Sequence, residues 1–263
     1  MPTKTALIIG GSRGIGAATA LQLARDGYDI ALTYSTAVEA AQEVKTQVEA
    51  IGKRCFYYQG TMDDAESPIA VTQQAIADLG RLDALVTVAG ITKIDPLLRW
   101  TAARLDEIWA VDFRAPILCT IEAAKQMKLQ WDSGEKRGVM EPRPYGIVHI
   151  ASIHGHRAVA NDAIYGALKA AIIRSTQSEA LEFGAYGIRV NAISPGLTAT
   201  RKHHETSGWL TEDWAGEMPL GRVGLSTEMA DVIAWLLSEK SNFVTGQTIP
   251  VDGGQGLLAH KDL

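Results

Sequence analysis

Short apolar runs alternate along the chain with longer segments in which apolar residues recur at helical spacing. The runs are continuous and rich in β-branched residues, as in strands that are buried on both faces of a sheet. Strands that alternate with helices are typical of a parallel sheet covered on both faces. The pattern therefore predicts an α/β fold, with a doubly wound parallel sheet of about seven strands. The predicted strands are Ala6–Ile9, Ile30–Tyr34, Cys55–Tyr58, Ala84–Val88, Ile147–Ile150, Arg189–Ile193 and Thr248–Val251.

Segments with helical spacing lie between these runs, and several stop at a glycine, which is a common end to a helix. One opens with Thr36-x-x-Glu39, the pattern of a capping box. Pro116 lies inside the longest segment, where it predicts a kink. The predicted helices are Ile15–Arg25, Thr36–Ile51, Pro68–Leu79, Thr101–Trp131, Ala163–Phe183 and Thr227–Leu237.

Two segments interrupt this alternation. Asp132–Tyr145 is charged and holds two prolines, so it predicts a surface loop. Residues 197–222 are polar and aromatic, with His203, His204, Trp209 and Trp214, and follow the end of a strand, where α/β folds bind ligands. We predict a substrate lid there; the alternative is an irregular surface excursion. No repeat or linker interrupts the chain, so we expect one domain over residues 1–263.

The composition limits the kinds of binding partner that we expect. The formal net charge is −5, which gives no reason to expect nucleic acid or an anionic membrane as partner. Cys55 and Cys119 are far apart and flanked by apolar residues, so we expect buried, reduced thiols. No apolar run is long enough for a signal-peptide core or a bilayer span. We expect a soluble, cytoplasmic protein.

A glycine-rich stretch lies where the first predicted strand meets the first predicted helix. It reads Gly10-x-x-x-Gly14-x-Gly16, not the commoner GxGxxG. Glycines allow a tight turn and a close approach of backbone to ligand. The helix N-terminus then offers free N–H groups to a pyrophosphate. A glycine loop alone is a weak signal, but its place after the first strand makes it a candidate dinucleotide site.

Tyr165 and Lys169 are four positions apart in a predicted helix and therefore share one face. A cation beside a phenol stabilises the phenolate, which lets such a tyrosine act as acid or base near neutral pH. Ser152, thirteen positions earlier, adds a hydroxyl donor for a substrate oxygen. These three residues predict a site that moves a proton onto or off a carbonyl or alcohol.

Taken in order, these motifs resemble the short-chain dehydrogenase/reductase family in its single-domain, Rossmann-like form. The resemblance covers nearly the whole chain, and the chain looks most like the branch of 3-oxoacyl-acyl-carrier-protein reductases, sugar dehydrogenases and small carbonyl reductases. The matching residues are Gly10-x-x-x-Gly14-x-Gly16, Ala89-Gly90, Ser152, Tyr165-x-x-x-Lys169, Asn191-x-x-x-Pro195-Gly196, and the tail Thr245-Gly246-Gln247 with Val251-Asp252-Gly253-Gly254.

The resemblance implies hydride transfer between nicotinamide and a carbonyl or secondary alcohol. Ser152 would hydrogen-bond the substrate oxygen, Tyr165 would act as acid or base, and Lys169 would assist Tyr165 and bind the nicotinamide ribose. The family's tail segment makes tetramer contacts, so the resemblance also implies a homotetramer.

NADP(H) is the expected cofactor. Members that prefer NAD usually carry an acidic residue at the end of the second strand. Here that strand ends in Tyr34-Ser35, while Arg13 offers a guanidinium to a 2′-phosphate. By resemblance, the cofactor contacts are Gly10, Ser12, Arg13, Gly14, Ile15, Gly16, Tyr34, Ser35, Gly60, Thr61, Ala89, Gly90, Tyr165, Lys169, Pro195, Gly196, Thr198 and Thr200.

One departure falls in the catalytic set. The family usually has an Asn in its fourth helix, and Asp112 occupies that place here. In the family, the backbone carbonyl of this residue holds a water that relays protons to the lysine. Asp112 keeps a carbonyl but adds a negative charge near Lys169. We expect activity to be retained but altered.

Other departures concern the cofactor site. The family's Asn-Asn-Ala-Gly is here Thr87-Val88-Ala89-Gly90, and its Thr before the first glycine is Ile9. An apolar contact between Ile9 and Val88 is expected to replace the lost hydrogen bond. Gly60-Thr61 stands where an acidic or amide residue usually contacts adenine, and Asp63 is a possible substitute.

Four alternatives compete with this prediction. His154 and His156 form an HxH beside Ser152, but no familiar zinc spacing accompanies them, so no metal site is expected. A non-catalytic NADP(H)-binding sensor or scaffold is possible in view of Asp112. Epimerases and dehydratases need a longer C-terminal domain, and enoyl reductases space Tyr and Lys more widely. The sequence leaves the substrate open.

Overall fold

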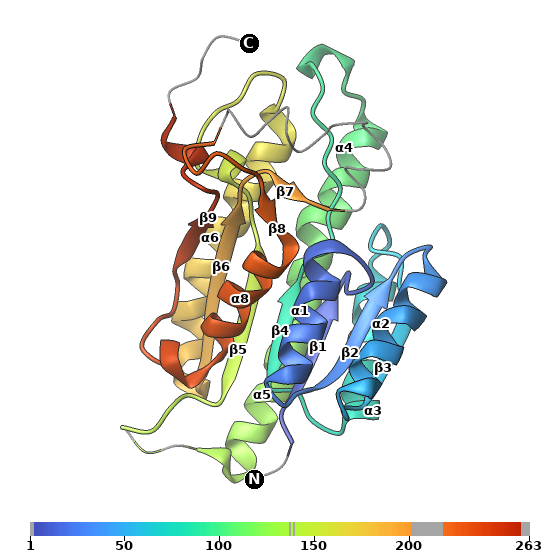
Figure 1. The fold of residues 1–263 in the computed structure, drawn as a ribbon, viewed down its shortest axis with the longest axis vertical. Helices are drawn as coiled ribbons and strands as arrows, with labels where there is room; N and C mark the ends of the chain where they lie inside the picture. The colour runs from blue at the N-terminus through green and yellow to red at the C-terminus, as the bar shows by residue number, and fades with distance from the viewer. Residues whose placement is uncertain (1–2, 137, 139, 201–217, 259–263) are drawn as a thin grey trace.

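The computed structural model describes residues 3–136, 138, 140–200 and 218–258. Within these residues, the centre of the molecule is a seven-stranded sheet in the order β3-β2-β1-β4-β5-β6-β9 (Figure 1). Every neighbouring pair of its strands is parallel. This confirms the predicted fold class. The strands are β1 (Thr5–Ile9), β2 (Asp29–Tyr34), β3 (Cys55–Gln59), β4 (Ala84–Thr87), β5 (Tyr145–Ile150), β6 (Ile188–Pro195) and β9 (Thr248–Val251).

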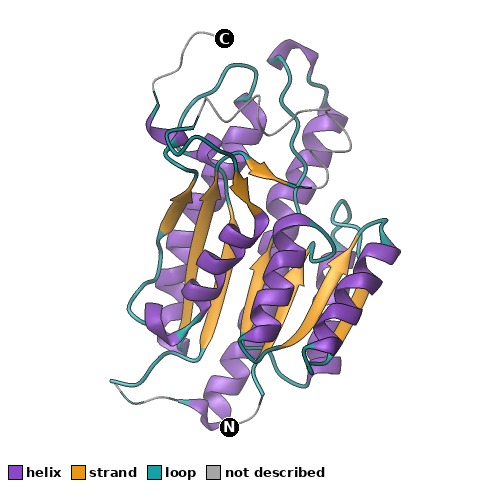
Figure 2. Ribbon diagram, in the orientation of Figure 1, coloured by secondary structure: helices purple, strands orange, loops and turns teal. Residues whose placement is uncertain are grey.

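Helices cover both faces of this sheet (Figure 2). The apolar faces of α1, α2 and α8 pack with Ile8, Ile30 and Val86 in one buried cluster. Those of α3, α5 and α6 pack with Leu7, Ile9 and Leu85 in a second cluster. The larger helices are α1 (Gly14–Arg25), α2 (Val38–Ala50), α3 (Glu66–Leu79), α4 (Ala102–Trp109), α5 (Ala115–Gln130), α6 (Ala163–Phe183) and α8 (Ser226–Leu237).

The strand order places a topological switch between β1 and β4. From β1 the chain builds outward through β2 and β3, and then returns to the other side with β4, β5 and β6. The loops that follow β1 and β4 therefore diverge at the carboxyl edge of the sheet, where open α/β sheets bind their ligands. The strand arrows that are visible in Figure 2 point toward this edge.

The helix boundaries correct one prediction and bear on a second. The predicted capping box at Thr36 and Glu39 is wrong: α2 begins at Val38, and its N-cap Ala37 makes no side-chain cap. Thr36 therefore lies one residue before the N-cap and outside the capping position. The predicted kink at Pro116 lies next to a turn of π-helix, η2 (Ala110–Arg114), which separates α4 from α5. Pro116 has no N–H to offer the Asp112 carbonyl four residues earlier.

Two short strands were not predicted. β7 (Thr198–Ala199) and β8 (Gly224–Leu225) pair with each other above the carboxyl edge of the sheet. Most of the predicted lid, residues 201–217 with His203, His204, Trp209 and Trp214, lies outside the described residues, so the lid stays a prediction. No helix in the described part of the chain is both long and apolar enough to cross a membrane.

Candidate functional site

The glycine loop forms a tight turn between β1 and α1. Gly10 and Gly14 have positive φ angles of 83° and 52°, a region that favours glycine. A Cβ on Gly16 would lie 2.1 Å from the Gly10 carbonyl oxygen, so only glycine fits there. Helix α1 has no side-chain cap at its N-cap, Arg13, and no acidic residue in its first turn. Its terminal N–H groups can therefore bind an anion.

Thr33, in β2, anchors this loop to the sheet, a role that sequence reasoning missed. Its Oγ1 accepts a hydrogen bond of 2.9 Å from the Gly10 N–H, and its carbonyl accepts one of 2.9 Å from the Gly11 N–H. The family's usual threonine before the first glycine is absent here. Thr33 supplies a hydroxyl on the neighbouring strand instead.

Residues from three other loops meet the glycine loop. Ala89, after β4, lies against Gly10, since a Cβ on Gly10 would be 2.8 Å from the Ala89 nitrogen. The methyl group of Thr200 is 3.3 Å from the Cβ position of Gly14. The pairing of β7 with β8 brings in Ser226, whose hydroxyl donates to the Ala199 carbonyl over 3.2 Å. Pro195 ends β6, and Gly196 follows it, at the same edge of the sheet.

The part of the cofactor site that is expected to bind adenine lies around the end of β2. The Gly60 N–H donates to the Tyr34 carbonyl over 2.9 Å. The Thr61 hydroxyl donates to a carboxylate oxygen of Asp64 over 2.8 Å. Asp64 also accepts from two backbone N–H groups at the start of α3, and these hydrogen bonds hold its carboxyl pKa below the ordinary value. Asp63 contributes its carbonyl to Arg114.

The three predicted acid–base residues lie at the carboxyl edge. Ser152 follows β5 and is buried. Tyr165 and Lys169 are one turn apart in α6, with Lys169 Nζ 5.5 Å from the centre of the Tyr165 ring. Lys169 Nζ also donates to the Ile150 carbonyl over 3.3 Å. The Ser152 Oγ accepts from the His154 N–H over 3.2 Å, and its own hydrogen has no acceptor among the described residues.

Asp112 lies directly beside Lys169. Its Oδ2 is 3.0 Å from Lys169 Nζ, and its Oδ1 accepts a hydrogen bond of 2.7 Å from the Ile91 N–H. Both side chains are almost fully buried. The π-helical turn η2 presents Asp112 at this point, and Gly90 leaves the space for it, since a Cβ there would be 3.3 Å from Asp112 Oδ2.

The turn after β4 is held by backbone bonds, not by the predicted apolar contact. The Ile9 carbonyl accepts hydrogen bonds of 2.8 Å from the N–H groups of Val88 and Ala89. The side chains of Ile9 and Val88 pack with clusters on opposite faces of the sheet. That prediction was wrong because neighbouring parallel strands here place these two side chains on different faces.

A buried polar chain runs from β4 through β5 to α6. Thr87 Oγ1 is 2.8 Å from His149 Nδ1, and His149 Nε2 is 2.8 Å from a carboxylate oxygen of Glu179. Sequence reasoning missed this chain because its members are far apart along the sequence. Thr87 stands where the family usually has an Asn, and His149 gives its hydroxyl a partner.

The two histidines beside Ser152 turn to different partners. His154 Nδ1 is 2.6 Å from Asp162 Oδ2, while His156 Nε2 is 2.8 Å from the Ser194 hydroxyl. In the described part of the chain, no group of three or more histidine, cysteine or acidic side chains is placed to hold a metal ion. The pairing of His154 with Asp162 was not expected from the sequence.

Comparisons with known proteins agree with this geometry. A family model described as enoyl-(acyl carrier protein) reductase matches residues 10–255. A 3-oxoacyl-(acyl-carrier-protein) reductase, FabG of Staphylococcus aureus, is 35% identical over 252 residues, which cover 96% of this chain and 98% of FabG. The chain belongs to the short-chain dehydrogenase/reductase family. Members of this family are oxidoreductases that bind a nicotinamide cofactor.

Solved structures of family members superpose closely on this fold. An acetoin dehydrogenase from Enterobacter cloacae gives a TM-score of 0.88 at 32% identity, covering 100% of this chain and 99% of its own. A short-chain dehydrogenase from Burkholderia cenocepacia, solved in complex with NADP, gives 0.84 at 31% identity, covering 96% and 97%. The glycine loop, with its uncapped helix N-terminus and the close approach of Ala89, fits a dinucleotide of this kind.

Proposed function

We propose that this protein is an NADP(H)-dependent oxidoreductase that acts on a carbonyl or secondary alcohol, as in reduction of a ketone or a 3-oxoacyl compound. The observation that carries the proposal is the convergence of Ser152, Tyr165 and Lys169 at the same sheet edge as the glycine loop. A nicotinamide dinucleotide bound there supplies the hydride. A pure binding protein has no use for a serine, tyrosine and lysine in this arrangement.

Each residue of the triad has a distinct task. Ser152 orients the substrate oxygen, because its hydroxyl hydrogen is free to donate among the described residues. Tyr165 gives its phenolic proton to that oxygen in reduction, and takes the proton back in oxidation. The Lys169 ammonium lies 5.5 Å from the Tyr165 ring and stabilises the phenolate. Lys169 also binds the nicotinamide ribose in this proposal.

Asp112 changes the electrostatic environment of the triad. Its carboxylate lies 3.0 Å from Lys169 Nζ and partly offsets the ammonium charge that acts on Tyr165. Its carbonyl lies four residues before Pro116, which has no N–H to bond to it. We propose that the carbonyl holds the water that relays protons to Lys169. Asp112 thus belongs to the catalytic set without replacing any member of the triad.

Arg13 supports NADP(H) over NAD(H). It is exposed at the N-cap of α1, beside the expected pyrophosphate site, and the strand end Tyr34-Ser35 carries no carboxylate to repel a 2′-phosphate. A guanidinium binds a phosphate through two parallel hydrogen bonds. By resemblance, the remaining cofactor contacts are those named from the sequence, from Gly10 to Thr200.

The proposed assembly and location rest on the family resemblance and on the two buried cysteines. The family resemblance supports a homotetramer built through the tail segment and a single domain over residues 1–263. Cys55 and Cys119 are both free and buried, which suits a reducing compartment. We therefore propose a cytoplasmic protein.

The direct test is oxidation of NADPH, followed by absorbance, against a panel of carbonyl compounds. The panel holds an acetoacetyl thioester, diketones, aryl ketones and sugar lactones, with NADH in parallel. We expect turnover with NADPH, and a loss of 10²–10⁴-fold in Tyr165→Phe, the range typical of general acid–base catalysis. Tight NADPH binding without turnover on any of these compounds would contradict the proposal and favour the sensor.

A further inference from the structure

Asp112 and Lys169 form a buried ion pair at a position where the family usually has a neutral Asn in place of the carboxylate. Asp112 Oδ2 lies 3.0 Å from Lys169 Nζ, and their side chains are 0% and 6% exposed. Asp112 Oδ1 accepts a hydrogen bond of 2.7 Å from the Ile91 N–H. Because a donor faces each oxygen, neither oxygen has room for a hydrogen of its own, as expected of an ionised carboxylate. The site therefore carries one negative charge that an Asn would not supply.

The ion pair lies at the turn that is expected to meet the nicotinamide half of the cofactor. Gly90 is one of the expected cofactor contacts, and a Cβ there would be 3.3 Å from Asp112 Oδ2 and 3.4 Å from Lys169 Nζ. The Ile91 N–H that bonds Asp112 belongs to the same turn. Lys169 binds the nicotinamide ribose in the proposed function, and the placement of the ring beside this pair rests on that proposal.

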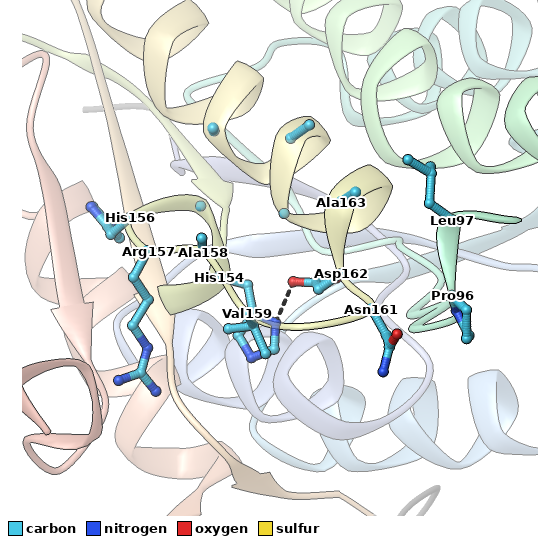
Figure 3. Close-up of a pocket in the computed structure, with 14 residues that line it drawn as sticks. Pro96, Leu97, His154, His156, Arg157, Ala158, Val159, Asn161, Asp162 and Ala163 are labelled. Carbon is cyan, nitrogen blue, oxygen red and sulfur yellow. Dashed lines mark hydrogen bonds and ion pairs between the residues drawn. The ribbon is translucent and has the colours of Figure 1, made fainter. Parts of the chain in front are cut away.

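Other charged side chains around the triad have partners of their own among the described residues. His154 Nδ1 is 2.6 Å from Asp162 Oδ2, and Figure 3 shows these two side chains facing each other. Arg114, in the same π-helical turn as Asp112, donates to the carbonyl of Asp63. Asp112 is thus the carboxylate that faces the ammonium of the triad.

The two redox forms of the cofactor differ in charge at one place. NADP⁺ carries a positive charge on the nicotinamide ring and NADPH does not, while their phosphates, riboses and adenine are the same. A protein charge near the ring therefore changes the affinity for one form relative to the other, whereas a charge near the adenine affects both forms alike. Burial strengthens this effect, because buried charges are screened less than exposed ones.

We infer that Asp112 makes the site favour the oxidised cofactor, and thereby makes the enzyme sensitive to the ratio of NADP⁺ to NADPH. The Lys169 ammonium alone would repel the cationic ring. The carboxylate of Asp112 makes the pair neutral and offsets that repulsion. NADP⁺ left by carbonyl reduction then competes with NADPH for the free enzyme, so reduction slows as NADP⁺ accumulates.

The test is equilibrium binding of NADP⁺ and of NADPH, each measured by titration calorimetry without substrate. We expect Asp112→Asn to raise the ratio of the NADP⁺ Kd to the NADPH Kd by about threefold to tenfold. The amide keeps an acceptor for the Ile91 N–H and removes only the charge. Asp112→Ser, a second neutral variant of different shape, should shift the ratio in the same direction.

Asp64→Asn is the matched control, because it removes one carboxylate charge at the expected adenine end of the site. Asp64 accepts from the Thr61 hydroxyl and from two backbone N–H groups at the start of α3. We expect this variant to leave the ratio of the two Kd values unchanged, even where both values shift together.

Inhibition by product gives a second readout on the working enzyme. NADP⁺ should inhibit NADPH oxidation competitively with respect to NADPH. We expect the ratio of the NADP⁺ inhibition constant to the NADPH KM to rise in Asp112→Asn in the same direction as the ratio of Kd values. A loss of general stability would not move this ratio, because it affects both forms of the cofactor alike.

The remaining outcomes separate this inference from the proposed function. An unchanged or lower ratio of Kd values in Asp112→Asn and Asp112→Ser would overturn the inference. An equal rise in Asp64→Asn would also overturn it, since the effect would then come from net charge and not from the place of Asp112. If wild-type protein reduces a ketone in a Tyr165-dependent way while the ratio stays fixed, only this inference fails. If wild-type protein binds neither form, the proposed function fails with it.

Discussion

At the scale of single residues, Asp112 places a carboxylate beside Lys169 at a position where the family usually has an Asn. Tyr165 and Lys169 could be predicted from the sequence because they are one helical turn apart, a local relation. The ion pair between Lys169 and Asp112 could be placed only approximately, since it joins two different helices. The pair of His154 and Asp162 was missed altogether. Its eight-residue separation spans a loop whose course no periodicity sets.

Asp112→Asn tests what the extra charge does. The amide oxygen can still accept from the Ile91 N–H, while the charge opposite Lys169 is removed. The ammonium then acts on Tyr165 without an offset and favours the phenolate more strongly. We expect turnover with NADPH to be retained or raised relative to the wild-type protein.

Asp112→Ala is the control, because alanine removes the acceptor as well. Breaking a buried ion pair by removing one partner costs about 3–5 kcal/mol, so this variant should unfold at lower denaturant concentration. Asp112→Asn that folds and binds NADPH, yet has lost its turnover, would show that the carboxylate itself is required.

At the scale of elements, the interiors of strands and helices could be predicted from the sequence, and their ends could be predicted less well. All seven strands of the sheet lie within two residues of their predicted bounds, because each strand is a short, continuous run of mostly apolar or β-branched residues. The capping box failed because a cap depends on backbone geometry that four residues of sequence do not determine. The strands β7 and β8 were missed because two-residue strands carry no periodicity.

The helix predicted over Thr101–Trp131 is divided in the structure into α4, η2 and α5, and this division affects the site. Pro116 predicted an irregularity, and the structure has one, but as a π-helical turn just before the proline. That turn presents Asp112 to Lys169 and Ile91. Sequence could indicate that the helix is disturbed, but the direction in which the side chains then point depends on the packing around the turn.

At the scale of the whole molecule, two apolar clusters on either side of the sheet hold the carboxyl edge in place. The topological switch between β1 and β4 follows from the strand order. The sequence predicted the alternation of strands and helices, and thereby the sheet. Which strand lies beside which could be inferred only through the family resemblance, because apolar runs alone do not specify neighbours.

The buried core also predicts a loss of stability in alkali. Burial raises the pKa of the Cys55 thiol to about 12, that of Cys119 to about 11, and that of the Tyr28 phenol to about 12. In the unfolded chain, the pKa of a thiol is about 8.5 and that of a phenol is about 10. Because the folded pKa values are raised, the stability from these neutral groups is complete below the unfolded values. It is lost as pH rises toward the folded values.

Urea unfolding between pH 7.5 and 10 measures this effect. We expect the free energy of unfolding to fall over this range. The double variant Cys55→Ala, Cys119→Ala should start from a lower stability, since two buried side chains are truncated, but show a shallower fall. An equal slope in both proteins would mean that the thiols do not ionise on unfolding in this range.

The central claim is direct transfer of a hydride onto a carbonyl carbon with a proton from Tyr165. The measurement that tests it most directly is isotope tracing, in ordinary water, with NADPH that carries deuterium at both hydrogen positions of nicotinamide C4. The account predicts one deuterium on the carbinol carbon of the product and none on oxygen after exchange. Tyr165→Phe should slow the reaction without changing this position. A product without deuterium at that carbon, or no product while NADPH is bound, would contradict the account.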